Sequence, residues 1–173
     1  MYTSLMEDSH TTIYVTIGLP GSGKSTWASQ FFRPHEVVSS DTARVLLCGS
    51  IEQSMTKHAW ELVHTIIRLK LESQQSHIVI DSTSVLRRDR VNLVKFLRSH
   101  MSSHSQIVGL VFAPTLETTL KQNQQRENVV PEEYIRNKLQ ALKSHPPSYE
   151  EGFDKLLIVN NDLGLRIEVP DGL

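Results

Sequence analysis

Short apolar runs alternate along the chain with longer segments in which apolar residues recur every three or four positions. The runs are rich in β-branched residues, as buried strands of a parallel sheet are. They predict strands at 12–17, 36–39, 78–80, 107–112 and 156–159, with a sixth at 166–169 left open. The periodic segments predict helices at about 25–32, 40–48, 54–74, 115–126 and 131–145, and a further helix through Val91, Val94, Leu97 and Met101.

This alternation predicts an α/β fold with a mostly parallel sheet and helices on both faces, because parallel neighbours need crossover connections. Ligands of such sheets bind beyond the carboxyl ends of the strands. Asp41, Asp81 and the stretch Gly18–Ser25 all lie at the carboxyl ends of predicted strands. We expect residues 1–10, which are polar and unpatterned, to form a loose tail, and residues 11–173 to form a single domain.

The stretch Gly18-Leu19-Pro20-Gly21-Ser22-Gly23-Lys24-Ser25 fits the G-x-x-x-x-G-K-[ST] phosphate-binding loop. Its glycines let backbone N–H groups point at the phosphates of a nucleotide. Lys24 is expected to reach the β- and γ-phosphates, and the Ser25 hydroxyl to bind Mg²⁺. An ordinary glycine-rich turn would need neither of these side chains. The predicted nucleotide-binding residues are Gly18, Pro20, Gly21, Ser22, Gly23, Lys24, Ser25 and Thr26.

Composition limits the location and the partners of the protein. The 18 Lys and Arg residues nearly balance the 19 Asp and Glu residues, so a nucleic acid would have to bind at a local patch. No apolar run approaches the length of a membrane span, and the first residues do not resemble a secretory signal. Cys48 is the only cysteine and is expected to be a small buried apolar residue. These features predict a cytoplasmic protein without a membrane partner.

The order of motifs resembles the kinase domain of polynucleotide 5′-kinases, as found in phage enzymes and in bacterial end-healing enzymes. The resemblance covers about residues 12–160 and rests on Ile17–Ala28, Ser39-Ser40-Asp41 with Arg44, Ile80–Thr83, and Asn123 with Arg126 before Val130-Pro131. It implies a P-loop fold like that of adenylate kinase, with five parallel strands in the order 2-3-1-4-5 and a helical lid over about residues 115–145. It also implies that ATP with Mg²⁺ phosphorylates the 5′-hydroxyl of RNA or DNA.

The resemblance assigns roles to the residues that match. Asp41 matches the general base, Arg126 a lid arginine that closes over the transferring phosphate, and Lys24 completes the catalytic set. Asp81 would organise Mg²⁺ together with Ser25.

Acceptor binding would involve Asp41 and Arg44, which matches the arginine that grips a phosphate of the acceptor strand, with Thr83 and Arg88 as further candidates. Such domains are often fused to a phosphatase or a ligase, so these enzymes are possible partners on separate chains. The oligomeric state is left open.

Two departures from the family pattern affect the lid and acceptor assignments. Gln122 stands where an arginine is usual, although Lys121 is adjacent, and Ser84 stands where an asparagine is usual. A kinase of the same fold acting on a small metabolite, a sugar nucleotide or an aminoacyl-tRNA is therefore an alternative. A nucleotide-dependent switch is another, but it would need a water-positioning residue, whereas Asp41 beside Arg44 favours a kinase.

Each site residue also has a purely structural interpretation. Asp41 could cap the short helix that follows it, Asp81 could cap a helix as well, and Arg126 could be a solvated surface residue. The basic cluster between the third and fourth strands is interpreted as a solvated helix face, with an acceptor-strand patch as the alternative. Its members are Arg87, Arg88, Arg90, Lys95 and Arg98.

Overall fold

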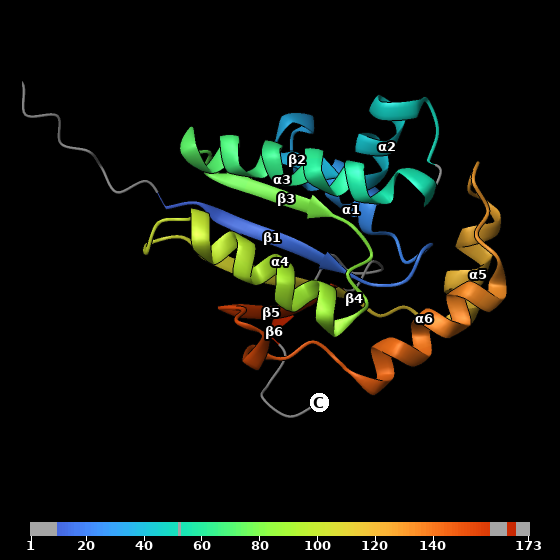
Figure 1. The fold of residues 1–173 in the computed structure, drawn as a ribbon. Coiled ribbons are helices and arrows are strands. Elements are labelled where there is room, and N and C mark those ends of the chain that lie inside the picture. The colour runs from blue at the N-terminus through green and yellow to red at the C-terminus, as the bar shows by residue number, and fades with distance from the viewer. Residues whose placement is uncertain (1–9, 52, 160–165, 169–173) are drawn as a thin grey trace, which may run out of the picture.

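A central six-stranded sheet organises the protein in a computed structural model that describes residues 10–51, 53–159 and 166–168 (Figure 1). The strands are β1 (Thr12–Ile17), β2 (Val37–Ser39), β3 (His77–Asp81), β4 (Gln106–Phe112), β5 (Lys155–Val159) and β6 (Arg166–Glu168). Their order is β2-β3-β1-β4-β5-β6. The first five strands are parallel, which confirms the predicted order 2-3-1-4-5, and β6 adds an antiparallel edge strand beside β5.

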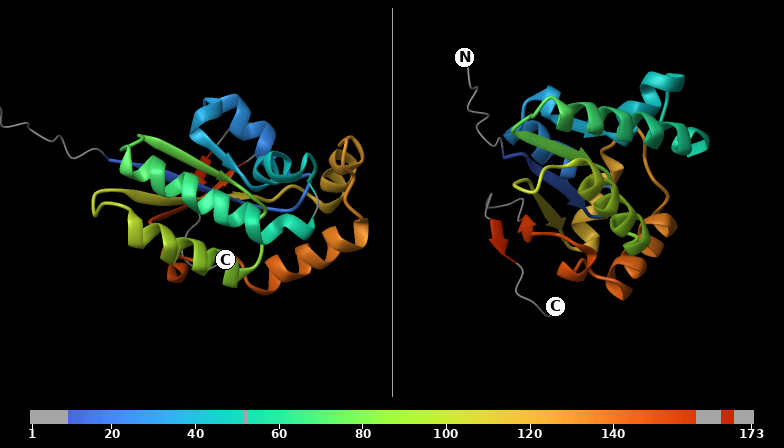
Figure 2. Two further views of the ribbon diagram at one scale, coloured as in Figure 1. Left: turned by 45° about the horizontal axis from the view of Figure 1, so that its top comes forward. Right: turned by 60° about the vertical axis from the view of Figure 1, so that its left-hand side comes forward.

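Helices cover both faces of the sheet, as predicted (Figures 1 and 2). They are α1 (Lys24–Phe31), α2 (Ser40–Cys48), α3 (Thr56–Glu72), α4 (Arg87–His100), α5 (Leu116–Gln124) and α6 (Glu132–Ser144), with short 3₁₀ turns η1 (Pro34–Glu36), η2 (Gln53–Met55) and η3 (Tyr149–Glu151). In the described part of the chain, no helix has both the length and the apolar character to cross a membrane.

The two faces of β1 belong to different cores. Ile13, Val15 and Ile17 are fully buried against the apolar stripes of α3 and α4. On the opposite face Trp27 and Ala28 of α1 pack against β3 and β4. Helices α5 and α6 cover neither face and lie beyond the carboxyl ends of the strands (Figure 1). This arrangement leaves the strand ends between α2 on one side and the α5–α6 pair on the other.

The structure contradicts the interpretation of Arg90 as part of a solvated face, because its side chain is 0% exposed. Arg90 lies on the same helix face as the buried Leu93, Val94 and Leu97, three, four and seven residues later, so its side chain points inward. There Glu151 accepts from its Nε and one terminal nitrogen at 2.6 and 2.7 Å. All five N–H groups are satisfied, since the carbonyls of Ser84, Val85 and His145 accept the other three.

Cys48 also differs from the expectation, since it is exposed. It is the last residue of α2, next to the C-cap Gly49, and so lies beyond the part of the helix that packs on the protein. Its thiol donates to the carbonyl of Arg44 over 3.3 Å. The predicted tail falls, apart from His10, outside the described residues.

We expect Arg90→Ala to lower the free energy of unfolding by about 3–5 kcal/mol, because it removes the partner of a buried carboxylate. Only the half-exposed Arg87, 3.9 Å from Glu151, would then be near that carboxylate. The matched control is Arg88→Ala, whose side chain is 81% exposed, and it should change stability by less than about 0.5 kcal/mol. Urea unfolding measures both, and similar losses in the two variants would contradict this assignment.

Candidate active site

Hydrogen bonds join the segments that follow β1 and β3. The N–H of Gly18, the first residue after β1, donates to the carbonyl of Thr83 over 2.9 Å. The Thr16 hydroxyl donates to the carbonyl of Ser82 over 2.9 Å and accepts from the N–H of Ser82 over 3.1 Å. The loop between β1 and α1 therefore lies directly beside the end of β3, which carries Asp81.

The loop before α1 has a backbone suited to anion binding. Gly21 and Gly23 have φ angles of +81° and +88°, which side chains would strain. Gly23 is also the N-cap of α1, so the positive end of this helix points toward the loop. The first turn of α1 contains no acidic side chain that would compete with a bound phosphate.

Lys24 is buried inside this loop. Its ammonium donates to the carbonyl of Leu19 over 2.7 Å and contacts the hydroxyl of Ser22 at 3.4 Å. Burial lowers the pKa of Lys24 from 10.5 to about 8, the negative charge of Asp81 partly opposes this, and the positive charge of Arg126 lowers the pKa further. The ammonium lacks a carboxylate in direct contact among the described residues, and a polyphosphate would supply the missing negative charge.

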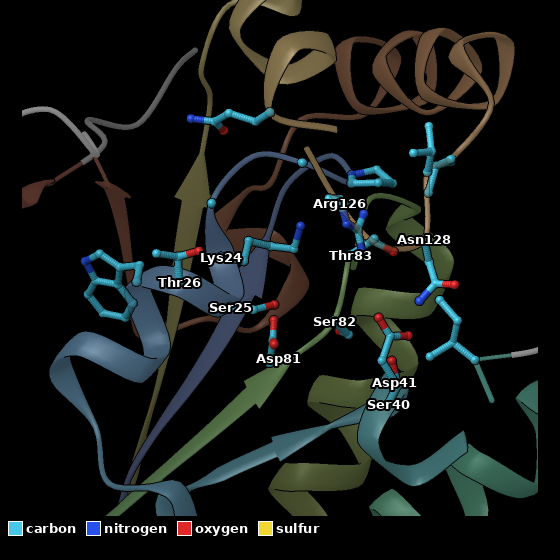
Figure 3. A pocket seen from close by; sticks show the side chains of 18 of the residues that line it. Lys24, Ser25, Thr26, Ser40, Asp41, Asp81, Ser82, Thr83, Arg126 and Asn128 are labelled. Atoms are coloured by element: carbon cyan, nitrogen blue, oxygen red, sulfur yellow. The ribbon is translucent and has the colours of Figure 1, made fainter. Parts of the chain in front are cut away.

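Asp81 and Ser25 lie together on the other side of the loop (Figure 3). The Ser25 hydroxyl donates to the carboxylate of Asp81, which is 8% exposed. Burial raises the pKa of Asp81, whereas the bond from Ser25 and the charge of Lys24 lower it. One carboxylate and one hydroxyl suit Mg²⁺, which binds few protein oxygens and otherwise keeps phosphates and waters. Among the residues placed by the structure, no cluster of three or more His, Cys, Asp or Glu side chains could hold a metal ion.

Asp41 and Arg44 occupy the first turns of α2, at the opposite wall. Arg44 NH1 donates to Asp41 Oδ1 over 2.5 Å, and Arg44 NH2 donates to the Thr56 hydroxyl over 3.4 Å. The side chain of Arg44 is only 7% exposed, whereas that of Asp41 is 53% exposed. The Nε of Arg44 is buried without a hydrogen-bond partner in the part of the chain that the structure describes. The pair thus presents an open carboxylate beside a guanidinium held in place.

Neither carboxylate acts as a helix cap. The N-cap of α2 is Ser39, whose hydroxyl accepts from the N–H groups of Asp41 and Thr42 at 3.2 and 3.4 Å. The N-cap of α4, the helix after Asp81, is Leu86 and makes no side-chain cap bond. Both carboxylates therefore remain available for binding and chemistry.

Arg126 comes from the loop between α5 and α6, because α5 ends at Gln124, two residues earlier than predicted. In Figure 3 its guanidinium lies beside Thr83 and faces the pocket that contains Lys24. Its positive charge acts on the pKa values of both Lys24 and Asp81. Lys121 is exposed and lies outside the pocket lining seen in the described residues.

These side chains converge on one pocket of about 980 Å³. This volume is at the upper end of the ~300–1,000 Å³ of ligand pockets and leaves room for a nucleotide and an acceptor. The predicted residues that line it are Pro20, Gly21, Gly23, Lys24, Ser25, Thr26, Asp41, Arg44, Asp81, Thr83 and Arg126.

Three predicted residues do not line the pocket as the structure describes it. Gly18 and Ser22 are buried in the body of the loop. Arg88 is exposed at the start of α4, where its Nε lies 3.4 Å from Asp89 Oδ1, and it is not brought to the site.

Sequence patterns missed the apolar part of the wall. Ile51 before η2 and Val129 and Tyr134 at the α5–α6 side line the same pocket. Val129 and Tyr134 are 58% and 44% exposed. The sequence did offer one signal. Val129 and Tyr134 are an apolar and an aromatic residue within polar segments, where a role in the core is not expected.

Comparison with known proteins identifies the family. A family model described as an AAA domain matches residues 13–146, most of the chain. The chain belongs to the AAA domain family. This AAA domain has a P-loop kinase fold, and such a fold implies nucleotide binding. No curated protein matches its sequence.

Several solved structures share the fold of this AAA domain at low identity. One chain of the Pnkp1/Rnl/Hen1 RNA repair complex superimposes with a TM-score of 0.68 at 21% identity, over 88% of this chain and 49% of that one. The AvrRxo1-ORF1:-ORF2 complex with ATP gives 0.67 at 14%, over 94% and 58%. Shikimate kinase from Acinetobacter baumannii gives 0.52 at 17%, over 88% and 86%. The AAA domain thus spans about half the length of the RNA repair chain.

The affinity for ATP should fall as the pH rises above about 8. Below that pH Lys24 is protonated in both the free and the bound protein. A bound polyphosphate raises the pKa of Lys24, so above about pH 8 binding takes up a proton, and the Kd should increase by up to about tenfold per pH unit. Titration calorimetry from pH 7 to 9.5 measures the change. Lys24→Arg, which keeps its charge, should bind without this dependence, and an equal slope in both proteins would assign the titration to another group.

Proposed function

We propose that this protein is an ATP-dependent phosphotransferase that moves the γ-phosphate to the 5′-hydroxyl of a polynucleotide. The observation that carries the proposal is the position of the Asp41–Arg44 pair, which faces the phosphate-binding loop across one pocket. A carboxylate there is placed to accept a proton, and a fixed guanidinium beside it is placed to bind a phosphate near the same hydroxyl. The RNA repair complex contains a chain of this fold, which supports an acceptor of this class.

In the proposed reaction Asp41 accepts the proton of the acceptor hydroxyl as its oxygen attacks the γ-phosphorus. The bond from that phosphorus to the bridging oxygen breaks, and ADP leaves with the bonding electrons. Lys24 and Arg126 stabilise the negative charge on the transferring group. Ser25 and Asp81 are the residues that would hold Mg²⁺, which neutralises charge on the β- and γ-phosphates when bound.

Two other acceptors compete with a polynucleotide. Shikimate kinase has this fold, and the match covers most of both chains, so a small metabolite is the second candidate. Water would be the acceptor of a nucleotide-dependent switch. The exposed carboxylate of Asp41 favours a true acceptor over water, because the positive charge of Arg44 beside it would attract an anionic group attached to that acceptor.

The test uses γ-labelled ATP, Mg²⁺ and a panel of acceptors: 5′-hydroxyl RNA and DNA oligonucleotides, nucleosides, nucleoside 3′-phosphates, sugars and shikimate. Label on the oligonucleotides supports the proposal. Label on a sugar or shikimate alone would replace it with the metabolite kinase, and label found solely in free phosphate would replace it with the switch. If an oligonucleotide is phosphorylated, phosphatases and ligases of end repair become the expected partners on separate chains.

Asp41→Asn should lower kcat by about 10²- to 10⁴-fold, because the amide cannot accept the proton. The affinity for ATP should hardly change, since Asp41 lies on the side of the pocket where the acceptor is proposed to bind. Asp89→Asn provides the control, because this carboxylate is half-exposed and pairs with Arg88 outside the pocket. Single-turnover kinetics and ATP binding separate the two effects, and loss of ATP binding in Asp41→Asn would move Asp41 to the donor site.

Arg44→Ala should raise the KM for oligonucleotides and nucleoside 3′-phosphates more than the KM for nucleosides. A nucleoside has no phosphate for the guanidinium to bind, so it loses less. Steady-state kinetics with the three acceptor types gives the comparison. Equal damage with all of them would mean that Arg44 supports Asp41 and does not contact the acceptor.

A further inference from the structure

Asn123 has a place in the α5–α6 segment that the proposed chemistry does not use. It lies in the last turn of α5 and is 3% exposed. Its side-chain Nδ2 donates to the carbonyl of Val130 over 2.8 Å, and its Oδ1 accepts from the N–H of Val130 over 3.1 Å. One side-chain amide thus bonds both backbone groups of a residue seven positions later, as a neighbouring strand would.

These two bonds close the loop of residues 125–129, which carries Arg126. The Arg126 N–H also donates to the carbonyl of Asn123 over 3.2 Å. The loop is otherwise polar and largely exposed, with Glu127 and Asn128 at its tip. The hydrogen bonds of the buried Asn123 therefore fix the position of the Arg126 backbone.

The same residue lies against the phosphate-binding loop. A Cβ atom built on Gly21 would approach the carbonyl of Thr119 to 2.8 Å and the N and Cβ atoms of Asn123 to 3.1 Å. The tip of the loop thus packs on the backbone of α5, where Thr119 is fully buried. On the far side of the segment Ile135 of α6 is 0% exposed and clusters with Leu19. Both helices are braced on the loop that would hold the phosphates.

We propose that Asn123 is a positioning residue that latches the Arg126 loop to the phosphate-binding loop. The Arg126 guanidinium is then held in the free protein at the position where the γ-phosphate of ATP would bind. This inference rests on the proposed role of Arg126 in phosphate transfer. It differs from a hinged lid, because α5 and α6 both stay packed on the phosphate-binding loop.

The first test compares Asn123→Ala with Gln124→Ala, a matched change at an exposed position outside the pocket lining of the described residues. Asn123→Ala should lower kcat about five- to hundredfold, the range that two net hydrogen bonds provide, with little change in the Kd for ATP. Gln124→Ala should behave like the wild type. An unchanged kcat in folded Asn123→Ala, or an equal effect in the control, would overturn the proposal.

A double-variant cycle asks whether Asn123 acts through Arg126. In an Arg126→Ala background the further change Asn123→Ala should lower kcat by less than about twofold, because the group it positions is gone. If the two single-variant losses in kcat multiply in the double variant, the proposal is overturned, since Asn123 would then act on a different part of the site. The activity measured is transfer from ATP to whichever acceptor the wild type uses, water included.

Limited trypsin digestion tests the latch without any activity, and so separates its failure from failure of the proposed function. Cleavage after Arg126 should become at least about tenfold faster in Asn123→Ala, because cleavage requires local opening of the loop. Cleavage after Arg88, exposed on α4, should keep its wild-type rate. Equal acceleration at both sites, or none at Arg126, would overturn the proposal.

Should Asn123→Ala fail to fold, Asn123→Asp takes its place in all three measurements. Its carboxylate keeps an acceptor for the Val130 N–H, but it loses the donor to the Val130 carbonyl and places a negative charge beside that oxygen. If neither variant folds, Asn123 is a folding residue, and the positioning role is wrong.

Discussion

A buried guanidinium connects the segment beside the phosphate-binding loop with the end of α6. Arg90 binds the carbonyls of Ser84 and Val85, which directly follow the Thr83 carbonyl that holds Gly18. It also binds the carbonyl of His145, the C-cap of α6. The phosphate-binding loop and α6 are thus fixed relative to one charge, which Glu151 neutralises. An apolar side chain in place of Arg90 would leave the Glu151 carboxylate without its buried partner and three buried carbonyls without donors.

The fold was predictable because its signals are local. The strands contain short β-branched runs and the helices keep one apolar stripe, so the alternation alone limits the topology. The phosphate-binding loop was predictable because its backbone needs glycine at particular positions, and Gly21 and Gly23 do have positive φ angles. The order of five parallel strands came with the family resemblance and was correct.

What the sequence could not provide was the partner of each polar side chain. Arg90 looked like its neighbours Arg87 and Arg88 because its carboxylate is 61 positions away in the sequence. Asp41 could have been a cap until the structure showed that Ser39 fills that position. Asn123 belonged to the family motif without a role, since its bonds to Val130 depend on where α5 ends. In each case the missing information is a tertiary contact rather than a propensity.

The charges in the pocket explain why its donor ligand should be a polyphosphate. Lys24 and Arg126 are close enough for one to lower the pKa of the other, so the free protein holds two cations against their mutual repulsion. The negative charge of Asp81, which accepts a hydrogen bond from Ser25, offsets part of this repulsion. A ligand with several negative charges placed between the two cations removes the repulsion and raises the pKa of Lys24. A neutral ligand or one with a single charge would gain much less binding free energy from this effect. The proposed latch at Asn123 would keep Arg126 from moving away to reduce its repulsion with Lys24.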